Sequence, residues 1–496
     1  MLRYILSSAL ALFCFAAPAF AASPPGDVVG KITVGYQGWF ACIGDDSPIN
    51  SWWHWAPNSS RPPSPKNNDI PCWPDLREYT HLYPTAYANL GNGQPASLFS
   101  SYDQQTVDRQ FLWMRQNGCD TAALQRFNPY SPEGSNRNAM LAAILQAAPA
   151  TGRKFYIMYD VSGWKNMQSE IKTDWIDVIQ KTYHALDSPA YAHQNGKPVV
   201  CIWGFGFNDG NRPFSAAACL DVIQWFKAQG CYVIGGVPTW WRTSDHDSYP
   251  DFLGVYSAFD MLSPWMVGRI GSIRDSDSYL KNTNLGDQAY CNAHGIDYQP
   301  CVLPGGNGQR SHGDLMWHEF YNMIKLGCQG IYISMFDEYG EANQIAKTAE
   351  DASMEPTNAG PRMFTLDQDG TRCSSDYYLR LTADGGKMLK GQIVLTATRP
   401  TPPECVRFYQ QAGYAGDASQ SLVAGSYTQS QLASLGVPNA IASAQVPRGW
   451  TVTLYTGDNF TGPSWALTSD TSNFSTLTPK AIDKISSCKI TSPPSS

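Results

Sequence analysis

The chain has 496 residues, of which 16% are charged, and its formal net charge is −7 at pH 7. Phosphate binding calls for a basic patch, and the absence of any Lys/Arg run therefore argues against a nucleic-acid partner. Aromatic residues make up 12% of the chain, including 16 Trp, several of which lie beside Gly, Pro or Asp in expected loops. Exposed aromatic rings suit the C–H faces of sugars.

The first residues have the pattern of a secretory signal peptide. Arg3 gives the positive start, an apolar run covers 4–17, and 19–21 form a small-residue cleavage site. The apolar run is too short to span a membrane, and no later stretch is long enough. We therefore expect 1–22 to be removed and the mature protein to be secreted (extracellular or periplasmic), with no membrane span.

An oxidising compartment makes the cysteines candidates for disulfides. Removal of Cys14 with the signal peptide leaves an even number of them. We expect Cys42 to pair with Cys72, and Cys405 to pair with Cys488 across the C-terminal segment.

No metal site is expected. Cys201 and Cys231 lie in apolar runs and are expected to be buried free thiols. No cysteine pair has the CxxC spacing of a zinc site. Residues 317–319 resemble the start of the zinc-protease motif H-E-x-x-H, but Asn322 occupies the position of the second histidine.

From about residue 31 to residue 339, short apolar runs alternate with helical patterns. The strand candidates are 32–37, 120–127, 154–161, 198–206, 231–238, 260–265, 298–303 and 330–336. The helical patterns are 104–116, 138–147, 175–185, 216–228, 276–293 and 312–325. This alternation predicts an α/β fold with a buried parallel sheet. Eight strands over this length indicate a (β/α)8 barrel of the TIM type, with a doubly wound open sheet as the alternative.

The composition changes after the barrel. We assign 23–398 to the barrel domain, 399–403 to a stiff Pro-rich linker, and 404–496 to a small all-β domain. Within the barrel domain, 38–103 form an unusually long connection rich in Trp and Pro, and loops of that length are usually functional.

Carboxylates follow the last predicted strand, at the end of a barrel where active sites lie. They are Asp337, Glu338 and Glu341, whose mutual repulsion costs stability unless it serves a function. One helical turn would place Glu338 and Glu341 on the same side, with Cβ atoms about 5–6 Å apart. That separation suits acid/base catalysis on a glycosidic bond. The alternative is a solvated acidic loop or an acidic helix N-terminus.

Other strand ends and the Trp-rich connection supply candidate sugar-binding residues. We expect a sugar platform at paired Trp240 and Trp241, and either a sugar contact or an arginine partner at Asp160. The full set of candidate substrate-binding residues is Tyr36, Trp39, His54, Arg126, Asp160, Trp203, Trp240, Trp241, Trp265, Asp337 and Tyr339.

The segment 333–345 resembles the signature of glycoside hydrolase families 99 and 71. The E-W-H-E core of family 99 corresponds here to Glu338-Tyr339-Gly340-Glu341. The segments 34–40, 53–55 and 347–351 are similar to the 71/99-like subgroup, and the resemblance covers about 30 to 395.

This resemblance implies a retaining, endo-acting α-mannosidase that needs no metal or other cofactor. It implies that Glu338 assists attack by the sugar 2-hydroxyl, that Glu341 protonates the leaving oxygen, and that Tyr36 lies at the reacting sugar. Tyr339 and Gly340 replace the family's Trp-His pair, so α-glucan, xylan and arabinan remain open as substrates besides mannan.

The C-terminal segment resembles a βγ-crystallin module. Residues 455–462 fit its Y-x-x-x-x-F-x-G hairpin signature, and 406–409 would begin the first Greek key. Many such modules bind Ca²⁺ through two loops. Here 438–443 and 482–487 both depart from the loop signature, which leaves weak Ca²⁺ binding or a purely stabilising or wall-attaching domain.

Together these features predict a secreted, monomeric glycoside hydrolase that acts on a polysaccharide or glycan. Two alternatives stay open: a non-catalytic carbohydrate-binding protein, and a polysaccharide lyase on the same barrel.

Overall fold

The computed structural model describes residues 22–306, 310–360, 363–437, 440–478, 481 and 485–494. The predicted signal peptide, apart from Ala22, lies outside these residues, as do positions 438, 439 and 482–484 of the predicted calcium loops. No helix within the described ranges is long and apolar enough to cross a membrane.

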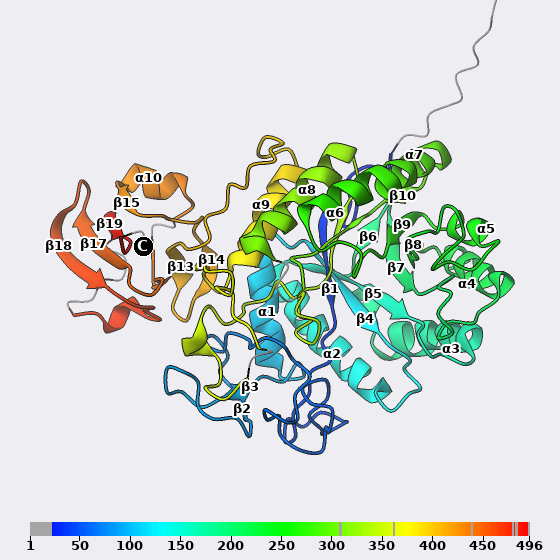
Figure 1. The fold of residues 1–496 in the computed structure, drawn as a ribbon, viewed down its shortest axis with the longest axis horizontal. Helices are drawn as coiled ribbons and strands as arrows, with labels where there is room; N and C mark the ends of the chain where they lie inside the picture. Colours follow the sequence, from blue (N-terminus) through cyan, green and yellow to red (C-terminus); the bar gives the residue numbers. More distant parts are fainter. Residues whose placement is uncertain are drawn as a thin grey trace, which may run out of the picture.

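The larger part of the protein is a curled parallel sheet surrounded by helices (Figure 1). Its strands run in the order β10-β9-β8-β7-β5-β4-β1-β12-β11, and β6 (His193–Gln194) pairs with β7. The strands are β1 (Ile32–Tyr36), β4 (Thr121–Arg126), β5 (Lys154–Asp160), β7 (Lys197–Trp203), β8 (Tyr232–Val237), β9 (Met261–Pro264), β10 (Asp297–Tyr298), β11 (Cys301–Val302) and β12 (Ile331–Ile333).

Each predicted strand is present, and the predicted seventh strand is split into β10 and β11. Only Gln299 and Pro300 separate these two pieces, and Pro300 has no N–H for the ladder. β10 pairs with β9, whereas β11 pairs with β12. The two ends of the strand order therefore meet in one chain segment, which fits a TIM-like barrel.

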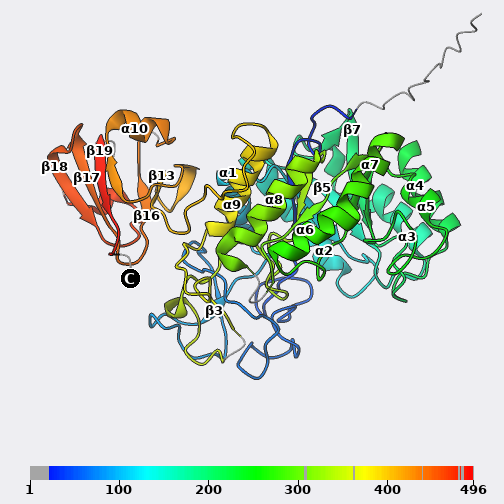
Figure 2. The same ribbon diagram turned by 45° about the horizontal axis from the view of Figure 1, so that its top comes forward.

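Helices cover the outer face of the sheet (Figures 1 and 2). The α-helices are α1 (Gln104–Gln116), α2 (Gly134–Thr151), α3 (Met167–Thr173), α4 (Ala216–Ala228), α5 (Leu253–Tyr256), α6 (Ile273–Tyr279), α7 (Leu285–His294), α8 (Asp314–Leu326) and α9 (Tyr377–Leu389). Segments of π-helix span Asp174–Thr182 and Leu280–Asn284, and 3-10 turns span Ala185–Asp187, Ser311–Gly313 and Ala352–Met354.

The α9 helix was not predicted, because Gly385 and Gly386 in its sequence disfavour a helix. The structure shows why a glycine stands at 385: a Cβ atom there would lie 2.7 Å from the ring of Phe320 on α8. Close packing between α8 and α9 therefore compensates for the poor helix propensity.

The predicted disulfides are wrong, since every cysteine in the described residues is a free thiol. The Cys42 thiol donates to the Phe99 carbonyl (3.4 Å), and the Gln344 amide donates to Cys72 Sγ (3.1 Å). Cys405 is buried near Arg380, at the contact with the barrel, whereas Cys488 lies in the core of the C-terminal domain. Cys201 and Cys231 are buried free thiols, as predicted.

The long connection after β1 contains only the short pair β2 (Tyr83–Pro84) and β3 (Ser97–Leu98). It is ordered by its aromatic side chains: Trp55 is completely buried, stacks on Phe40 at 3.9 Å and donates its indole N–H to the Phe99 carbonyl.

The C-terminal residues form two antiparallel sheets, ordered β14-β13-β16 and β15-β19-β17-β18, with a hydrophobic core of their own. The elements are β13 (Arg407–Gln411), β14 (Ala415–Ala418), β15 (Gly425–Tyr427), α10 (Gln429–Ser434), β16 (Ser443–Gln445), β17 (Thr451–Gly457), β18 (Thr461–Leu467), the 3-10 turn Phe474–Thr476 and β19 (Ser487–Thr491). We call residues 404–494 the C-terminal module.

The C-terminal module lies against α1 and α9 (Figures 1 and 2). The predicted linker 399–403 takes part in this contact. Arg399 pairs with Asp314 (2.8 Å), and the buried Thr401 hydroxyl donates to Asp384 (2.7 Å). These side chains fix the segment on the barrel surface.

Candidate active site

The acidic segment follows β12, at the carboxyl ends of the parallel strands. Asp337 and Glu338 are buried, whereas Glu341 is exposed. The predicted helical turn is wrong: the segment is an irregular turn in which Ala342 has a left-handed φ of 58°. The chain reverses here, because the Met335 N–H donates to the Asn343 carbonyl and the Ile345 N–H donates to the Met335 carbonyl.

Asp337 joins the ends of β12 and β1. Its two carboxylate oxygens accept the backbone N–H groups of Gln37 and Gly38, both at 2.8 Å. Complete burial raises the pKa of Asp337 to about 6, although these two hydrogen bonds oppose the rise. Asp337 therefore anchors the site, and its oxygens are already used by the backbone.

Glu338 is the most electrostatically perturbed carboxyl group of this segment. Burial, followed by repulsion from Glu341 and Asp337, raises its pKa well above the ordinary value. The Gln37 side-chain amide donates to Glu338 Oε2 (2.9 Å) and partly offsets this rise. Although the Glu341 side chain reaches the surface, the surrounding chain removes part of its hydration and so also raises its pKa. The charge of Glu341 raises the pKa of Glu338, so the two carboxyl groups titrate as a pair. The greater burial of Glu338 disfavours its charged form and so favours the proton there.

An aromatic stack begins two residues after Gln37. The rings of Trp39 and His54 stack at 3.7 Å, and Phe127 lies on Trp39 at 5.5 Å. Burial, with the nearby positive charge of Arg137, lowers the pKa of His54 to about 3, so this ring is neutral.

Several polar atoms of the aromatic stack and its neighbours are buried without a hydrogen-bond partner among the described residues. They are Gln37 Oε1, Trp39 Nε1, Trp53 Nε1 and His54 Nε2. Buried polar groups that lack partners cost free energy. A ligand rich in hydroxyl groups would supply both donors and acceptors to them.

A second group of predicted residues lies at the ends of β5, β7 and β9. Trp203 and Trp265 pack edge to face at 5.4 Å, and the Arg212 guanidinium lies 4.5 Å over the Trp203 ring. Arg212 donates to the Ser162 hydroxyl (2.7 Å), and the Ser162 N–H donates to Asp160 (2.9 Å). Burial raises the pKa of Asp160. Asp160 thus reaches an arginine through Ser162.

Two predicted tyrosines are engaged elsewhere. Tyr36 is fully buried and packs on Phe111, with its hydroxyl donating to Gln110 on α1. Tyr339 is also fully buried, and its hydroxyl donates to the Lys347 carbonyl (2.9 Å). Neither ring presents a surface to a ligand, so both belong to the support of the site.

Arg126 and Trp241 also belong to the framework. Arg126 is buried and makes two hydrogen bonds to Asp174, at 2.7 and 2.6 Å. Trp241 is buried between Tyr256 and Tyr290, so it cannot serve as a sugar platform.

Trp240 is half-buried, so part of its side chain is accessible. Its ring stacks on His246 at 4.6 Å and lies beneath the Arg269 guanidinium at 5.1 Å.

Two residues of the site were missed. Gln37 follows the first strand directly and could have been found by the rule applied to the other strand ends. Arg137 on α2 donates to the carbonyls of Gln37 and Gly38, both at 2.7 Å, and so holds the end of β1. Its position within a helix gave no signal in the sequence. In the described part of the chain, no group of three or more His, Cys, Asp or Glu residues could hold a metal ion.

No protein-family model matches the chain, and no curated protein matches it. Solved structures do resemble it. One is the GH99 endo-alpha-mannosidase from Bacteroides thetaiotaomicron, with 16% identity and a TM-score of 0.52 over 73% of this chain and 98% of that one. Its complex with Bis-Tris-propane matches over 74% and 98%, with the same identity and score. At this identity the likeness shows a shared fold.

The C-terminal residues are similar to a double mutant of a betagamma-crystallin domain from Clostridium beijerinckii. The two sequences are 44% identical over 18% of this chain and 96% of that one, with a TM-score of 0.17.

Proposed function

We propose that the protein is a secreted glycoside hydrolase whose carboxyl pair is Glu338 and Glu341. The observation that supports this most strongly is the asymmetry of the pair at the strand ends. Glu338 is buried with a strongly raised pKa, while Glu341 is exposed. Such asymmetry suits a pair in which one group donates a proton and the other accepts one.

We assign the proton donor to Glu338 and the acceptor to Glu341, which reverses the roles implied by the family resemblance. Glu338 gives its proton to the glycosidic oxygen as the bond to C1 breaks. Glu341 takes a proton from the sugar 2-hydroxyl, whose oxygen attacks C1 and forms a 1,2-anhydro sugar. Water then opens this ring, so the product retains the anomeric configuration.

The aromatic residues at the strand ends are the proposed sugar subsites. Trp39 and His54 form one, Trp203 and Trp265 a second, and Trp240 a third. The unpaired ring nitrogens of Trp39, His54 and Trp203 can bind sugar hydroxyl groups. The fold shared with an endo-alpha-mannosidase makes α-mannans the first substrates to test.

The remaining parts of the proposal concern the setting of the enzyme. We propose that the 1–22 segment directs secretion, that the enzyme acts as a monomer, and that catalysis uses no cofactor. The C-terminal module is proposed to be βγ-crystallin-like, with weak Ca²⁺ binding at most.

A product screen tests the function. The purified chain is incubated with α-mannans, α-glucans, xylans and arabinans beside Glu338→Gln and Glu341→Gln, and products are followed by mass and anomeric NMR. Asp187→Asn, whose side chain is 82% exposed, is the matched control. We expect release of a reducing sugar by the wild type and the control only. Binding without release by the wild type supports the carbohydrate-binding alternative, and an ultraviolet-absorbing unsaturated product supports the lyase.

A further inference from the structure

The C-terminal module reaches the acidic segment through a buried lysine. Lys347 lies just beyond that segment, and only 1% of its side chain is exposed. Its ammonium group bonds Glu78 and, at 3.3 Å, Oε1 of Gln445 from β16 of the module. Its carbonyl accepts the Tyr339 hydroxyl (2.9 Å) and the Asp75 N–H (3.0 Å). One residue thus contacts both the module and the chain beside Glu338.

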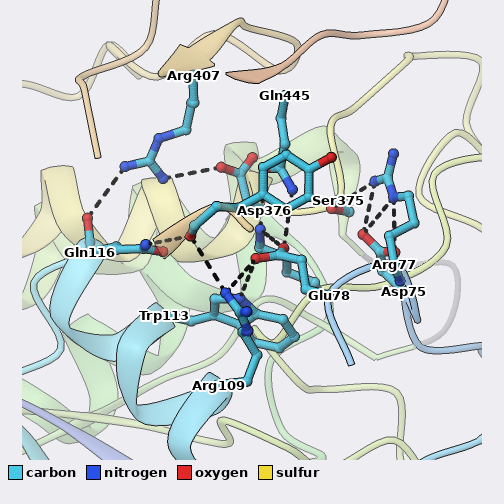
Figure 3. A network of polar contacts seen from close by, with 12 residues as sticks. Asp75, Arg77, Glu78, Arg109, Trp113, Gln116, Ser375, Asp376, Arg407 and Gln445 are labelled. Atoms are coloured by element: carbon cyan, nitrogen blue, oxygen red, sulfur yellow. Dashed lines mark hydrogen bonds and ion pairs between the residues drawn. The ribbon is translucent and has the colours of Figure 1, made fainter. Parts of the chain in front are cut away.

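Gln445 has hydrogen bonds on both sides of its amide. Its Oε1 accepts the Tyr409 hydroxyl of the module (2.6 Å), and its Nε2 donates to Glu78 (3.1 Å, Figure 3). Glu78 also receives the indole N–H of Trp113 on α1 (3.2 Å). A buried polar network in which these members are satisfied is rigid, and a single unmatched group would be costly.

Tyr339 connects this rigid network to the carboxyl pair, Glu338 and Glu341. Its ring is fully buried against Phe40 and Phe99, at 6.0 and 5.9 Å between centroids, and its backbone is bonded directly to that of Glu338. The hydroxyl bond to Lys347 fixes the far end of the ring. A shift of Lys347 would therefore tilt Tyr339 and move Glu338, and catalytic groups tolerate displacements of only about 0.5 Å.

A separate charge network holds the module in place. Asp376, next to the start of α9, pairs with Arg380 of that helix (2.8 Å) and Arg407 of β13 (3.1 Å, Figure 3). These guanidinium groups hold the pKa of Asp376 well below its usual range. Arg77 adds a bond to Asp470 of the module (3.1 Å). Because these contacts fix the module on the barrel, Gln445 meets Lys347 in one defined position.

We infer that Gln445 and Lys347 are positioning residues for the carboxyl pair, and that the C-terminal module is a built-in support of the active site. This inference rests on the proposed hydrolase activity for its kinetic consequence. It differs from the wall-attaching role, in which the module would affect only how the enzyme reaches its polymer.

Two leucine variants of the full chain test the inference. Gln445→Leu removes the bonds to Lys347, Glu78 and Tyr409. Gln116→Leu is the matched control: the Gln116 amide donates to the module carbonyls of Tyr414 and Gly416, both at 3.1 Å, and among the described contacts it has none with the acidic segment. On a short soluble substrate we expect kcat to fall about tenfold in Gln445→Leu with KM within twofold, and both values within twofold of wild type in Gln116→Leu.

Hydrogen exchange supplies a measurement that does not depend on activity. We expect faster amide exchange over 337–349 in Gln445→Leu and unchanged exchange there in Gln116→Leu. Tyr339→Phe removes only the hydroxyl bond to Lys347, keeps the packed ring, and should give the same two effects if Gln445→Leu fails to fold. Exchange over 337–349 that is unchanged in Tyr339→Phe, or equal in both leucine variants, overturns the inference. A wild type that hydrolyses no glycan refutes the proposed function, while the exchange data still decide the role of the module.

Discussion

The Gln37 side-chain amide donates a 2.9 Å hydrogen bond to Glu338 Oε2, and this bond joins the end of β1 to the end of β12. It is the described contact that most directly opposes the effect of burial on Glu338, because it stabilises the ionised carboxylate. The other oxygen of the same amide, Gln37 Oε1, has no partner among the described residues. Gln37 therefore adjusts the proton affinity of Glu338 and has a second amide atom that can still accept a hydrogen bond.

Replacing Gln37 should change the pH profile. In Gln37→Met the lowering effect on the Glu338 pKa is lost, so that pKa rises further. If Glu338 acts as the acid, activity is lost as pH rises through its pKa, and this alkaline limb of kcat/KM moves to higher pH in the variant. A limb that stays in place or moves to lower pH would contradict the assignment. The profile is measured with one soluble substrate for both proteins.

Asp337 should make the protein less stable as pH rises. Its pKa is about 6 in the folded protein against 3.8 for an unperturbed group. Between these pH values the unfolded chain has lost the proton and the folded protein keeps it, so stability falls with rising pH, by about 3 kcal/mol once pH exceeds both values. Below about pH 4 the effect is absent.

Asp337→Asn cannot titrate and should lack this loss. Urea unfolding at pH 4 and pH 7 compares the two proteins, and the variant should gain about 3 kcal/mol relative to wild type between these values. Its lost backbone hydrogen bond adds a cost that does not depend on pH. Equal pH dependence in the two proteins would show that Asp337 is not buried in its neutral form.

Arg126 should matter for stability and not for substrate affinity. Removing one partner of its buried pair with Asp174 leaves an uncompensated charge, so Arg126→Met should lower the free energy of unfolding by about 3–5 kcal/mol. Substrate KM should stay within twofold in the fraction that is folded. The double variant Arg126→Met with Asp174→Leu should recover most of the stability. A raised KM in the single variant would instead show that Arg126 takes part in substrate binding.

His54 should contribute a neutral hydrogen-bonding atom to ligand binding. His54→Phe keeps the stack on Trp39 and removes Nε2, so affinity should fall roughly tenfold with little change in Tm. Since the His54 pKa is about 3, ring protonation should not alter affinity between pH 5 and pH 8. His294→Phe is the control, because His294 stacks in the same way on Tyr290, at 3.9 Å, at the end of α7. Calorimetry showing equal affinity for His54→Phe and wild type would assign His54 to packing alone.

The sequence located the strands well, because buried parallel strands are continuous apolar runs bounded by polar residues. It located strand ends but not the direction of each side chain. Successive strand residues point to opposite faces, which explains why Tyr36 and Arg126 bond with helical residues outside the sheet while neighbouring Gln37 reaches Glu338.

Other features depended on contacts that have no local signal. An even number of cysteines says nothing of the distance between them, and Cys42 and Cys72 each lie in a separate hydrogen-bonded environment. Only the fold brings Arg137 to the end of β1, beside the acidic segment. Lys347 is near that segment in the sequence, but its contact with Gln445 of the C-terminal module depends on the fold. The acidic segment itself was recognisable, because neighbouring carboxylates at a strand end repel each other and so reduce stability unless they serve a function.

The most direct test of the central claim compares two substrates of one sugar in the Glu338→Gln variant. A natural glycan needs a proton on its leaving oxygen, whereas an aryl glycoside with an acidic phenol leaves without one. If Glu338 is the acid of a glycosidase, Glu338→Gln should lose about a thousandfold in kcat/KM on the glycan and less than about tenfold on the aryl glycoside, and Glu341→Gln should lose both activities. Equal losses on both substrates in Glu338→Gln, or full activity of that variant on the glycan, would contradict the account.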